Sequence, residues 1–162
     1  MKALLLIRHA KSSWDIDVAD FDRSLNPRGH KDAHEMANRL INKKIAIDKF
    51  ISSPAKRAII TAAYFANAYN ISEDQIVQIP TLYEPTMEAF LDAIIHLEDS
   101  INTSAIFSHN PTISSFANSL TNEQIDDMPT CAIFAIKVDI EHWKDFAKSK
   151  KEFWYFDYPK VH

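Results

Sequence analysis

The sequence predicts an α/β protein, a three-layer α/β/α sandwich around a mostly parallel central sheet. Short apolar runs of strand length alternate along the chain with longer stretches whose apolar residues recur every three or four positions. The short runs are continuously apolar, which is typical of strands buried on both faces of a parallel sheet. With 162 residues, the chain is long enough for one well-buried domain and short for two, so we expect a single domain over residues 1–162.

The first predicted strand runs from Ala3 to Ile7 and stops at Arg8-His9. In open α/β sheets, ligands bind beyond the carboxyl ends of the strands, so chemistry is expected at these two residues. Residues 11–26 are polar and rich in aspartate, and a loop of this length is typically functional or disordered. We expect a solvated acidic loop; the alternative is that its negative field repels small polyanions.

A helix over residues 27–43 follows, because Asn26 is a good N-cap and Pro27 suits the first helical position. Its apolar residues form one stripe. His30 and His34 lie one turn apart and off that stripe, a spacing that can bind a metal. No third ligand is evident, so we expect a solvated face and no metal.

The second predicted strand, residues 48–52, leads into Ser53-Pro54, which we expect to cap the next helix. Arg57 then lies near the start of that helix, at the carboxyl edge of the sheet. Backbone amides and the helix dipole both favour an anion there.

The second half of the chain repeats this alternation. Thr86 is the expected N-cap of a third helix, and Pro111 opens a fourth. One apolar run ends in Ser108-His109, as the first ends in Arg8-His9. The remaining strands are expected over residues 76–79, 104–107 and 131–138, with an edge strand at 153–156.

Composition excludes several classes of function. A net charge of -4 gives no electrostatic footprint for nucleic acid, and no apolar stretch approaches the ~20 residues that span a membrane. The amino terminus shows no signal peptide, and the single Cys131 cannot form an internal disulfide, which together favour a cytoplasmic location. We expect Cys131 to be a buried, small apolar residue rather than a nucleophile. The oligomeric state is not predicted.

Glycine is nearly absent. The chain has one, Gly29, where an average usage of about 7% would give about eleven. Walker loops and dinucleotide-binding fingerprints need several glycines to bring backbone amides onto phosphates, so neither is present and no cofactor is expected. Phosphate, if bound, must be held by side chains.

Two arginines and two histidines at one sheet edge would form a cationic cup that donates hydrogen bonds. The planar fork of arginine suits phosphoryl oxygens. One neutral imidazole can act as a nucleophile near pH 7, and the other can donate to the extra negative charge of the transition state. Taken singly, each of these residues is more often a surface feature, a salt-bridge partner or a satisfied core histidine.

Three ordered motifs resemble those of the histidine phosphatase superfamily, which includes phosphoglycerate mutases and acid phosphatases. They are Arg8-His9-Ala10-Lys11-Ser12-Ser13-Trp14-Asp15, Ser52-Ser53-Pro54-Ala55-Lys56-Arg57 with Thr61, and Ser108-His109. The resemblance covers essentially the whole chain and implies a phosphoglycerate mutase-like fold. It further implies that His9 is the phosphorylated nucleophile and that Arg8, Arg57 and His109 hold the phosphoryl group. Ser12, which lies within the first motif, and Asn110, which follows the third, complete the expected substrate-binding set.

Several features look like the small SixA-type phosphohistidine phosphatase branch: the short length, Ala10 in place of the usual glycine, the segment 22–29 and Met128-Pro129-Thr130. Glu84 matches the family position that protonates the leaving group, but an ordinary helix-leading carboxylate is an equal interpretation. An imidazole leaving group, with a conjugate-acid pKa of ~6.5, departs with little help, whereas an alkoxide needs a proton.

The resulting prediction is a metal-independent hydrolase that removes phosphate from phosphohistidine on a protein through a phosphorylated enzyme. The enzymatic alternative is a phosphomonoesterase acting on a small phosphorylated substrate, for which Glu84 or a loop aspartate would be the acid. The alternative outside enzymes is a phosphate-binding module without turnover.

Overall fold

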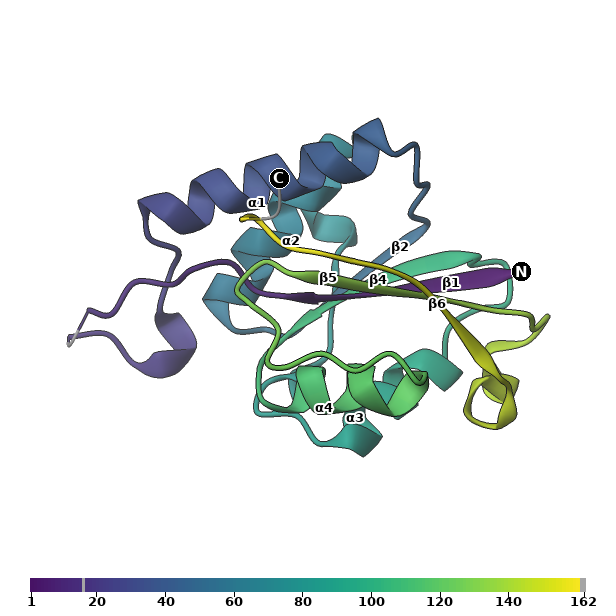
Figure 1. The fold of residues 1–162 in the computed structure, drawn as a ribbon. Helices are drawn as coiled ribbons and strands as arrows, with labels where there is room; N and C mark the ends of the chain where they lie inside the picture. The colour runs from purple at the N-terminus through teal and green to yellow at the C-terminus, as the bar shows by residue number, and fades with distance from the viewer. Residues whose placement is uncertain (16, 161–162) are drawn as a thin grey trace.

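The computed structural model describes residues 1–15 and 17–160, and it contains a six-stranded sheet (Figure 1). The strand order is β3-β2-β4-β1-β5-β6. β1 and β2 both pair in parallel with β4, and β3 pairs in parallel with β2, whereas β5 and β6 are antiparallel. The predicted mostly parallel sheet is therefore confirmed. The strands are β1 (Lys2–Arg8), β2 (Lys49–Ser52), β3 (Val77–Gln78), β4 (Thr103–Ser108), β5 (Ile133–Val138) and β6 (Lys151–Asp157).

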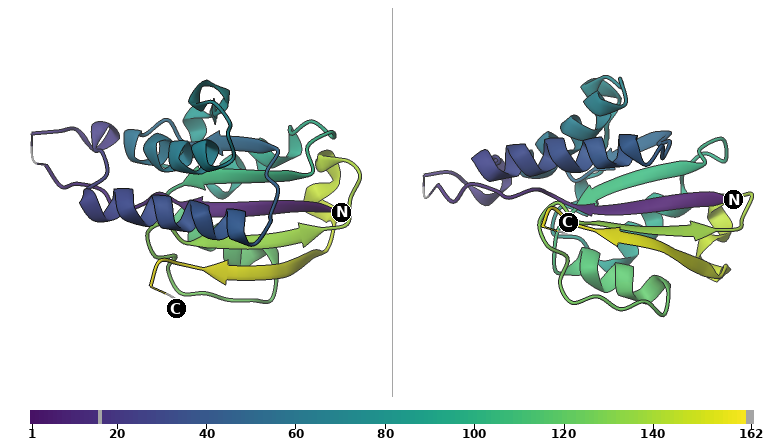
Figure 2. Two further views of the ribbon diagram at one scale, coloured as in Figure 1. Left: turned by 90° about the horizontal axis from the view of Figure 1, so that it is seen from above. Right: turned by 45° about the horizontal axis from the view of Figure 1, so that its top comes forward.

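Helices cover both faces of the sheet, which makes the predicted three layers (Figures 1 and 2). The side chains of β1 alternate between two cores: Leu5 and Ile7 pack under α1 and α2, and Leu4 and Leu6 pack on the opposite face, all four with no exposed surface. Burying each of these side chains contributes roughly 1.5–3 kcal/mol to the stability of the fold. A strand such as β1, which lies between two cores, therefore requires a continuous apolar run. The helices are α1 (Pro27–Asn42) and α2 (Lys56–Ala68) on one face, and α3 (Met87–Ile95) and α4 (Thr112–Leu120) on the other.

Short 3-10 segments complete the chain: η1 (Asp20–Asp22), η2 (Glu73–Gln75), η3 (Pro80–Leu82) and η4 (Trp143–Lys148). Within the described ranges, none of the helices combines the length and the apolar character needed to cross a bilayer.

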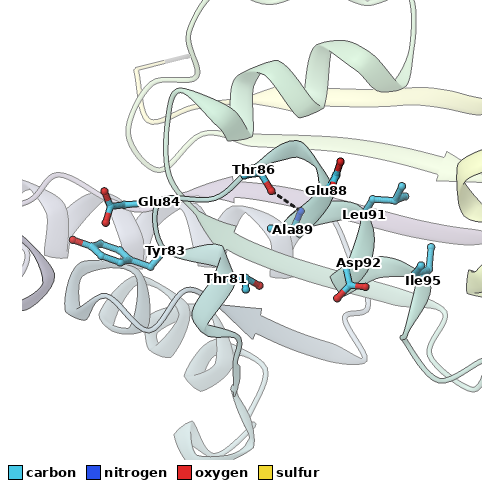
Figure 3. Close-up of a pocket in the computed structure, with 9 residues that line it drawn as sticks. All are labelled: Thr81, Tyr83, Glu84, Thr86, Glu88, Ala89, Leu91, Asp92 and Ile95. Atoms are coloured by element: carbon cyan, nitrogen blue, oxygen red, sulfur yellow. Dashed lines mark hydrogen bonds between the residues drawn. The ribbon is translucent and has the colours of Figure 1, made fainter.

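Two predicted helix caps are confirmed and one is wrong. The Asn26 side chain accepts a hydrogen bond from the Gly29 amide at 2.8 Å, and the Thr86 hydroxyl accepts one from the Ala89 amide at 3.1 Å (Figure 3). Ser53 does not cap α2, which begins at Lys56. The Ser53 hydroxyl instead accepts from the Ala55 amide and contacts a histidine of the site, so the turn before the helix is longer than predicted.

The strand expected from residue 131 begins at Ile133, because Cys131 has a left-handed backbone with φ 62°. The Cys131 amide donates to the carbonyl oxygens of Arg8 and His9, at 3.1 and 3.0 Å. Cys131 is fully buried, as predicted, and burial raises the pKa of its thiol. The strand predicted at 76–79 is only the two residues of β3, and β6 is the predicted edge strand.

The single glycine marks a close approach between α1 and the loop that follows β1. A Cβ atom on Gly29 would lie 2.1 Å from the carbonyl oxygen of Lys11. That oxygen accepts a hydrogen bond from the Asn26 amide at 3.0 Å, and the Ser13 amide donates to the Ser24 carbonyl at 2.8 Å. The first turn of α1 therefore fixes the backbone just after His9.

Candidate active site

The carboxyl ends of the adjacent parallel strands β2, β4 and β1 bring the three predicted motifs together. A pocket of about 240 Å³ lies at this edge, where the sequence predicted the site. Ser12 and Asn110 lie in its wall with the predicted arginines and histidines, and Glu84 does not. The lining residues are Arg8, His9, Lys11, Ser12, Trp14, Arg23, Arg57, His109, Asn110 and Thr130.

His9 is held in one tautomer. Its Nδ1 atom lies 2.8 Å from the carbonyl oxygen of Ala10, and a carbonyl oxygen can only accept, so Nδ1 carries the proton. Nε2 is then left with its lone pair, and it accepts a 3.4 Å hydrogen bond from Nε of Arg57. The ring therefore has the electronic form of a nucleophile.

Burial keeps the His9 ring neutral. The side chain is 6% exposed, and desolvation is the main reason that the pKa of His9 falls to about 3. The charges of His109, Arg57 and Arg8 lower it further, while the hydrogen bond to Ala10 opposes the shift. Near neutral pH, the lone pair on Nε2 is free of a proton.

His109 is oriented by Ser53. Its Nε2 atom lies 2.7 Å from the Ser53 hydroxyl, and the His9 and His109 ring centroids are 5.1 Å apart. Burial, followed by the charge of Arg57, lowers the pKa of His109 to about 4. Its Nδ1 atom is buried and has no hydrogen-bond partner within the described part of the chain. When Nδ1 carries a proton, an anion in the pocket is one group that could accept a hydrogen bond from it.

Arg8 offers a similar unused donor. Its guanidinium is fixed by a 2.8 Å hydrogen bond from one terminal nitrogen to the Met128 carbonyl. The Nε atom of Arg8 is buried and lacks a partner among residues 1–15 and 17–160. A buried guanidinium N–H with no acceptor favours an anionic ligand beside it.

Asp20 organises the other arginine, a role that the sequence did not reveal. Arg57 donates to the Asp20 carbonyl oxygen at 2.7 Å and to its carboxylate at 3.2 Å. The same carboxylate accepts from Tyr83 at 2.7 Å and from Arg23 at 3.2 Å. Led by the Tyr83 hydrogen bond, these contacts lower the pKa of Asp20 to about 2, although half of its side chain is exposed. The expectation of a purely solvated acidic loop is therefore wrong at Asp20.

Arg23 is a second residue that the sequence did not single out as a ligand. It is 7% exposed, and it donates to the Ser12 hydroxyl at 2.6 Å. The exposed ring of Trp14 stacks on its guanidinium, 3.8 Å from ring centroid to guanidinium carbon. Ser12 thus contacts a cation of the pocket wall, and Asn110 is fixed by a 3.0 Å hydrogen bond to the Met128 carbonyl.

Thr61 ties the first motif to the second. Its hydroxyl donates to the Arg57 carbonyl at 2.7 Å and accepts from the Ala10 amide at 2.9 Å. The threonine has no exposed surface, so this contact fixes the turn after His9 against α2.

Glu84 lies outside the pocket that contains His9. It is exposed, and it lines a neighbouring open groove of about 600 Å³ beside α3. Figure 3 shows Glu84 and Tyr83 at one end of this groove. Tyr83 separates the two regions, since its ring packs edge-on against His109 with centroids 5.7 Å apart.

The sequence profile of the histidine phosphatase superfamily (branch 1) matches residues 4–90, slightly more than half of the chain. The chain belongs to this superfamily. An uncharacterised protein of Mycobacterium leprae is 34% identical over 119 residues, 71% of each chain. Phosphoserine phosphatase 1 of Hydrogenobacter thermophilus is 38% identical over 86 residues, 49% of this chain and 39% of that protein. Membership agrees with the predicted resemblance and indicates phosphatase chemistry.

Solved structures show the same fold. A SixA protein from Agrobacterium tumefaciens superposes with a TM-score of 0.82 at 23% identity, covering 98% of both chains. The protein histidine phosphatase SixA complexed with tungstate superposes with a TM-score of 0.80 at 22% identity, covering 97% of both chains. The phosphoglycerate mutase-like fold that the resemblance implied is thereby confirmed, and at the level of fold it is that of SixA proteins.

Proposed function

We propose that this chain is a metal-independent phosphatase that forms a covalent phosphohistidine at His9 and acts best on phosphohistidine in a protein. The observation that carries the proposal is the tautomer of His9, whose Nδ1 proton is held by Ala10 so that the Nε2 lone pair faces Arg57. The work of the protein is then positioning and charge stabilisation, as in other phosphoryl transfers.

In the first step, the Nε2 lone pair of His9 attacks phosphorus, the N–P bond forms, and the bond to the leaving group breaks with its electron pair on the leaving atom. Arg8, Arg57 and His109 stabilise the charge on the phosphoryl oxygens through N–H donors. In the second step, water attacks phosphorus, and the N–P bond breaks with its electron pair returned to Nε2. The proton of the water leaves with inorganic phosphate, so the enzyme is regenerated.

The choice of substrate rests on the absence of a carboxylic acid that could protonate a poor leaving group. Among the described residues, those that line the pocket include no aspartate or glutamate. Asp20, with its pKa lowered to about 2, holds no proton near neutrality. An imidazole leaving group, with a conjugate-acid pKa of ~6.5, departs without strong acid catalysis, whereas an alkoxide does not.

The second candidate is a small-molecule phosphomonoesterase, favoured by the similarity to a phosphoserine phosphatase. It would require Glu84 to reach the leaving group from the groove beside α3. Glu84→Gln would then reduce kcat for alkyl esters and leave kcat for phosphohistidine unchanged.

The test compares metal-free hydrolysis of a phosphohistidine peptide, an aryl phosphate and an alkyl phosphate, with His9→Ala as the control. Strong preference for the peptide, lost in His9→Ala, supports the proposal. Equal turnover of the alkyl ester would show that a working general acid exists and would favour the phosphomonoesterase. Phosphate binding with no turnover of any substrate would leave only a binding module.

A further inference from the structure

A second cavity, of about 380 Å³, adjoins the pocket that contains His9. The two share Arg8, Lys11 and Thr130 in their walls, so a group in the second cavity lies close to a phosphoryl group in the first. The first turns of α1 form one side of the second cavity, and the segment after β6 forms another. Its other lining residues are Arg28, Asp32, Pro129, Tyr158, Pro159 and Lys160.

The charge of this cavity is strongly positive, although the whole chain has a net charge of -4. Four cationic side chains and one carboxylate line it. Arg28 balances that carboxylate, since its Nε atom lies 3.5 Å from Oδ2 of Asp32. Arg8, Lys11 and Lys160 form no ion pair within the described ranges, so the charge left over attracts an anion.

The walls of the cavity are held in place by Arg39, which projects from α1. Its guanidinium donates to the Asp157 carboxylate at 3.0 Å, to the Tyr158 carbonyl at 3.0 Å and to the Pro159 carbonyl at 3.1 Å. The cavity is therefore formed before a ligand arrives, which reduces the cost of binding.

We propose that this cavity is a subsite for a carboxylate that the substrate carries close to its phosphoryl group. The inference rests on the proposed function, because it assumes that the pocket with His9 takes the phosphoryl group. Arg8 faces both groups, and Lys11 donates to the carboxylate. Arg28 donates to it through its terminal guanidinium nitrogens, because its contact with Asp32 uses only Nε. Two sources present this chemistry: an acidic residue beside the phosphohistidine of a protein, or the carboxylate of a small phosphorylated acid.

Calorimetry on the full chain tests the subsite without requiring turnover. Phosphonoacetate carries a carboxylate beside its phosphonate, and phosphonoacetamide has the same shape without that charge. We expect the acid to bind on the order of ten-fold more tightly than the amide, as one charge-assisted hydrogen bond allows. Arg28→Gln should reduce this ratio to about two-fold, and Lys31→Gln should leave it unchanged.

Lys31 is the matched control because it is an exposed cation on α1 that does not line the cavity. Equal affinity for acid and amide in the wild-type protein would overturn the proposal. An equal fall in the acid-to-amide affinity ratio in Arg28→Gln and Lys31→Gln would also overturn the proposal, since a general positive field at the surface would then explain the preference for the acid.

Phosphohistidine peptides identify the source of the carboxylate. A higher kcat/KM for a peptide with aspartate beside the phosphohistidine than for its asparagine counterpart, lost in Arg28→Gln, supports the protein source. Equal kcat/KM for both peptides, with the calorimetric preference intact, supports the small phosphorylated acid. If neither peptide is hydrolysed, the proposed function fails, and the calorimetric ratio still decides whether the subsite exists.

Discussion

Replacing Gly29 by alanine tests how α1 fixes the loop that follows His9. Helix propensity alone predicts that Gly29→Ala stabilises α1 by roughly 0.5–1 kcal/mol. The structure predicts the opposite sign, because the new Cβ atom would lie 2.1 Å from the Lys11 carbonyl oxygen, where ordinary contacts begin at 3.4 Å. The atoms in conflict are backbone, so the loop must move as a unit.

The magnitude follows from these two opposing effects. Overpacking costs typically 1–3 kcal/mol, and a 2.1 Å contact with a backbone oxygen belongs at the upper end, about 2–3 kcal/mol. The net loss in the free energy of unfolding is then about 1–2.5 kcal/mol. Lys11 is two residues from His9, and a 1 Å displacement of a catalytic group can reduce the rate about 100-fold. We therefore expect kcat/KM to fall by roughly ten- to hundred-fold.

Urea denaturation and steady-state hydrolysis of an aryl phosphate measure the two effects, with Lys31→Ala as a control on the exposed side of α1. A Gly29→Ala protein that is as stable as the wild type or more so, with unchanged kcat/KM, would refute the close approach as the reason for this glycine.

Three further predictions concern the groups around the pocket. Asp20→Asn removes the charge that holds Arg57, so kcat/KM for an aryl phosphate should fall about ten-fold. The free energy of unfolding should change by less than about 1 kcal/mol, because the Asp20 side chain is half exposed. Increased turnover would instead support repulsion of small anions by the loop. Thr61→Val leaves the buried Ala10 amide without an acceptor, so the free energy of unfolding measured by urea denaturation should fall by about 1–3 kcal/mol. Thr61→Ser keeps the hydroxyl and should retain most of that stability. Equal stability of the two variants would contradict the role of the hydroxyl. The pKa of His9 is lowered to about 3, so between about pH 5.5 and 4 the unfolded chain binds a proton that the folded chain does not. Over this range the wild-type protein should lose about 1.4 kcal/mol more per pH unit than His9→Asn as the pH falls, with a shallower difference between about pH 6.5 and 5.5. Parallel pH profiles would contradict a neutral buried His9.

The arrangement of the sheet could be predicted because local patterns decide it. The run from Ala3 to Ile7 is apolar at every position, and a strand with helices on both faces requires this. Once the strands are parallel, their carboxyl ends must meet, so Arg8-His9, Arg57 and His109 come together whatever the details of the loops.

The support around these residues could not be predicted, because it depends on how irregular segments fold back. Asp20 lies in a loop without periodicity, and only the folded chain shows that its carboxylate reaches Arg57, Arg23 and Tyr83. Serine is a residue type that often caps helices, but the Ser53 hydroxyl orients His109 instead. A local propensity does not reveal such a tertiary partner.

The proposed mechanism depends most on which nitrogen of which histidine receives the phosphoryl group. The phosphorylated nitrogen can be identified by ³¹P NMR. The protein is mixed rapidly with an aryl phosphate, quenched in base and digested, and the spectrum of the phosphorylated peptide is recorded, with His9→Ala as the control. We predict phosphate on Nε2 of His9, because the Nδ1 proton is held by the Ala10 carbonyl. Phosphate on Nδ1 of His9 or on His109, or turnover that persists in His9→Ala, would contradict the mechanism.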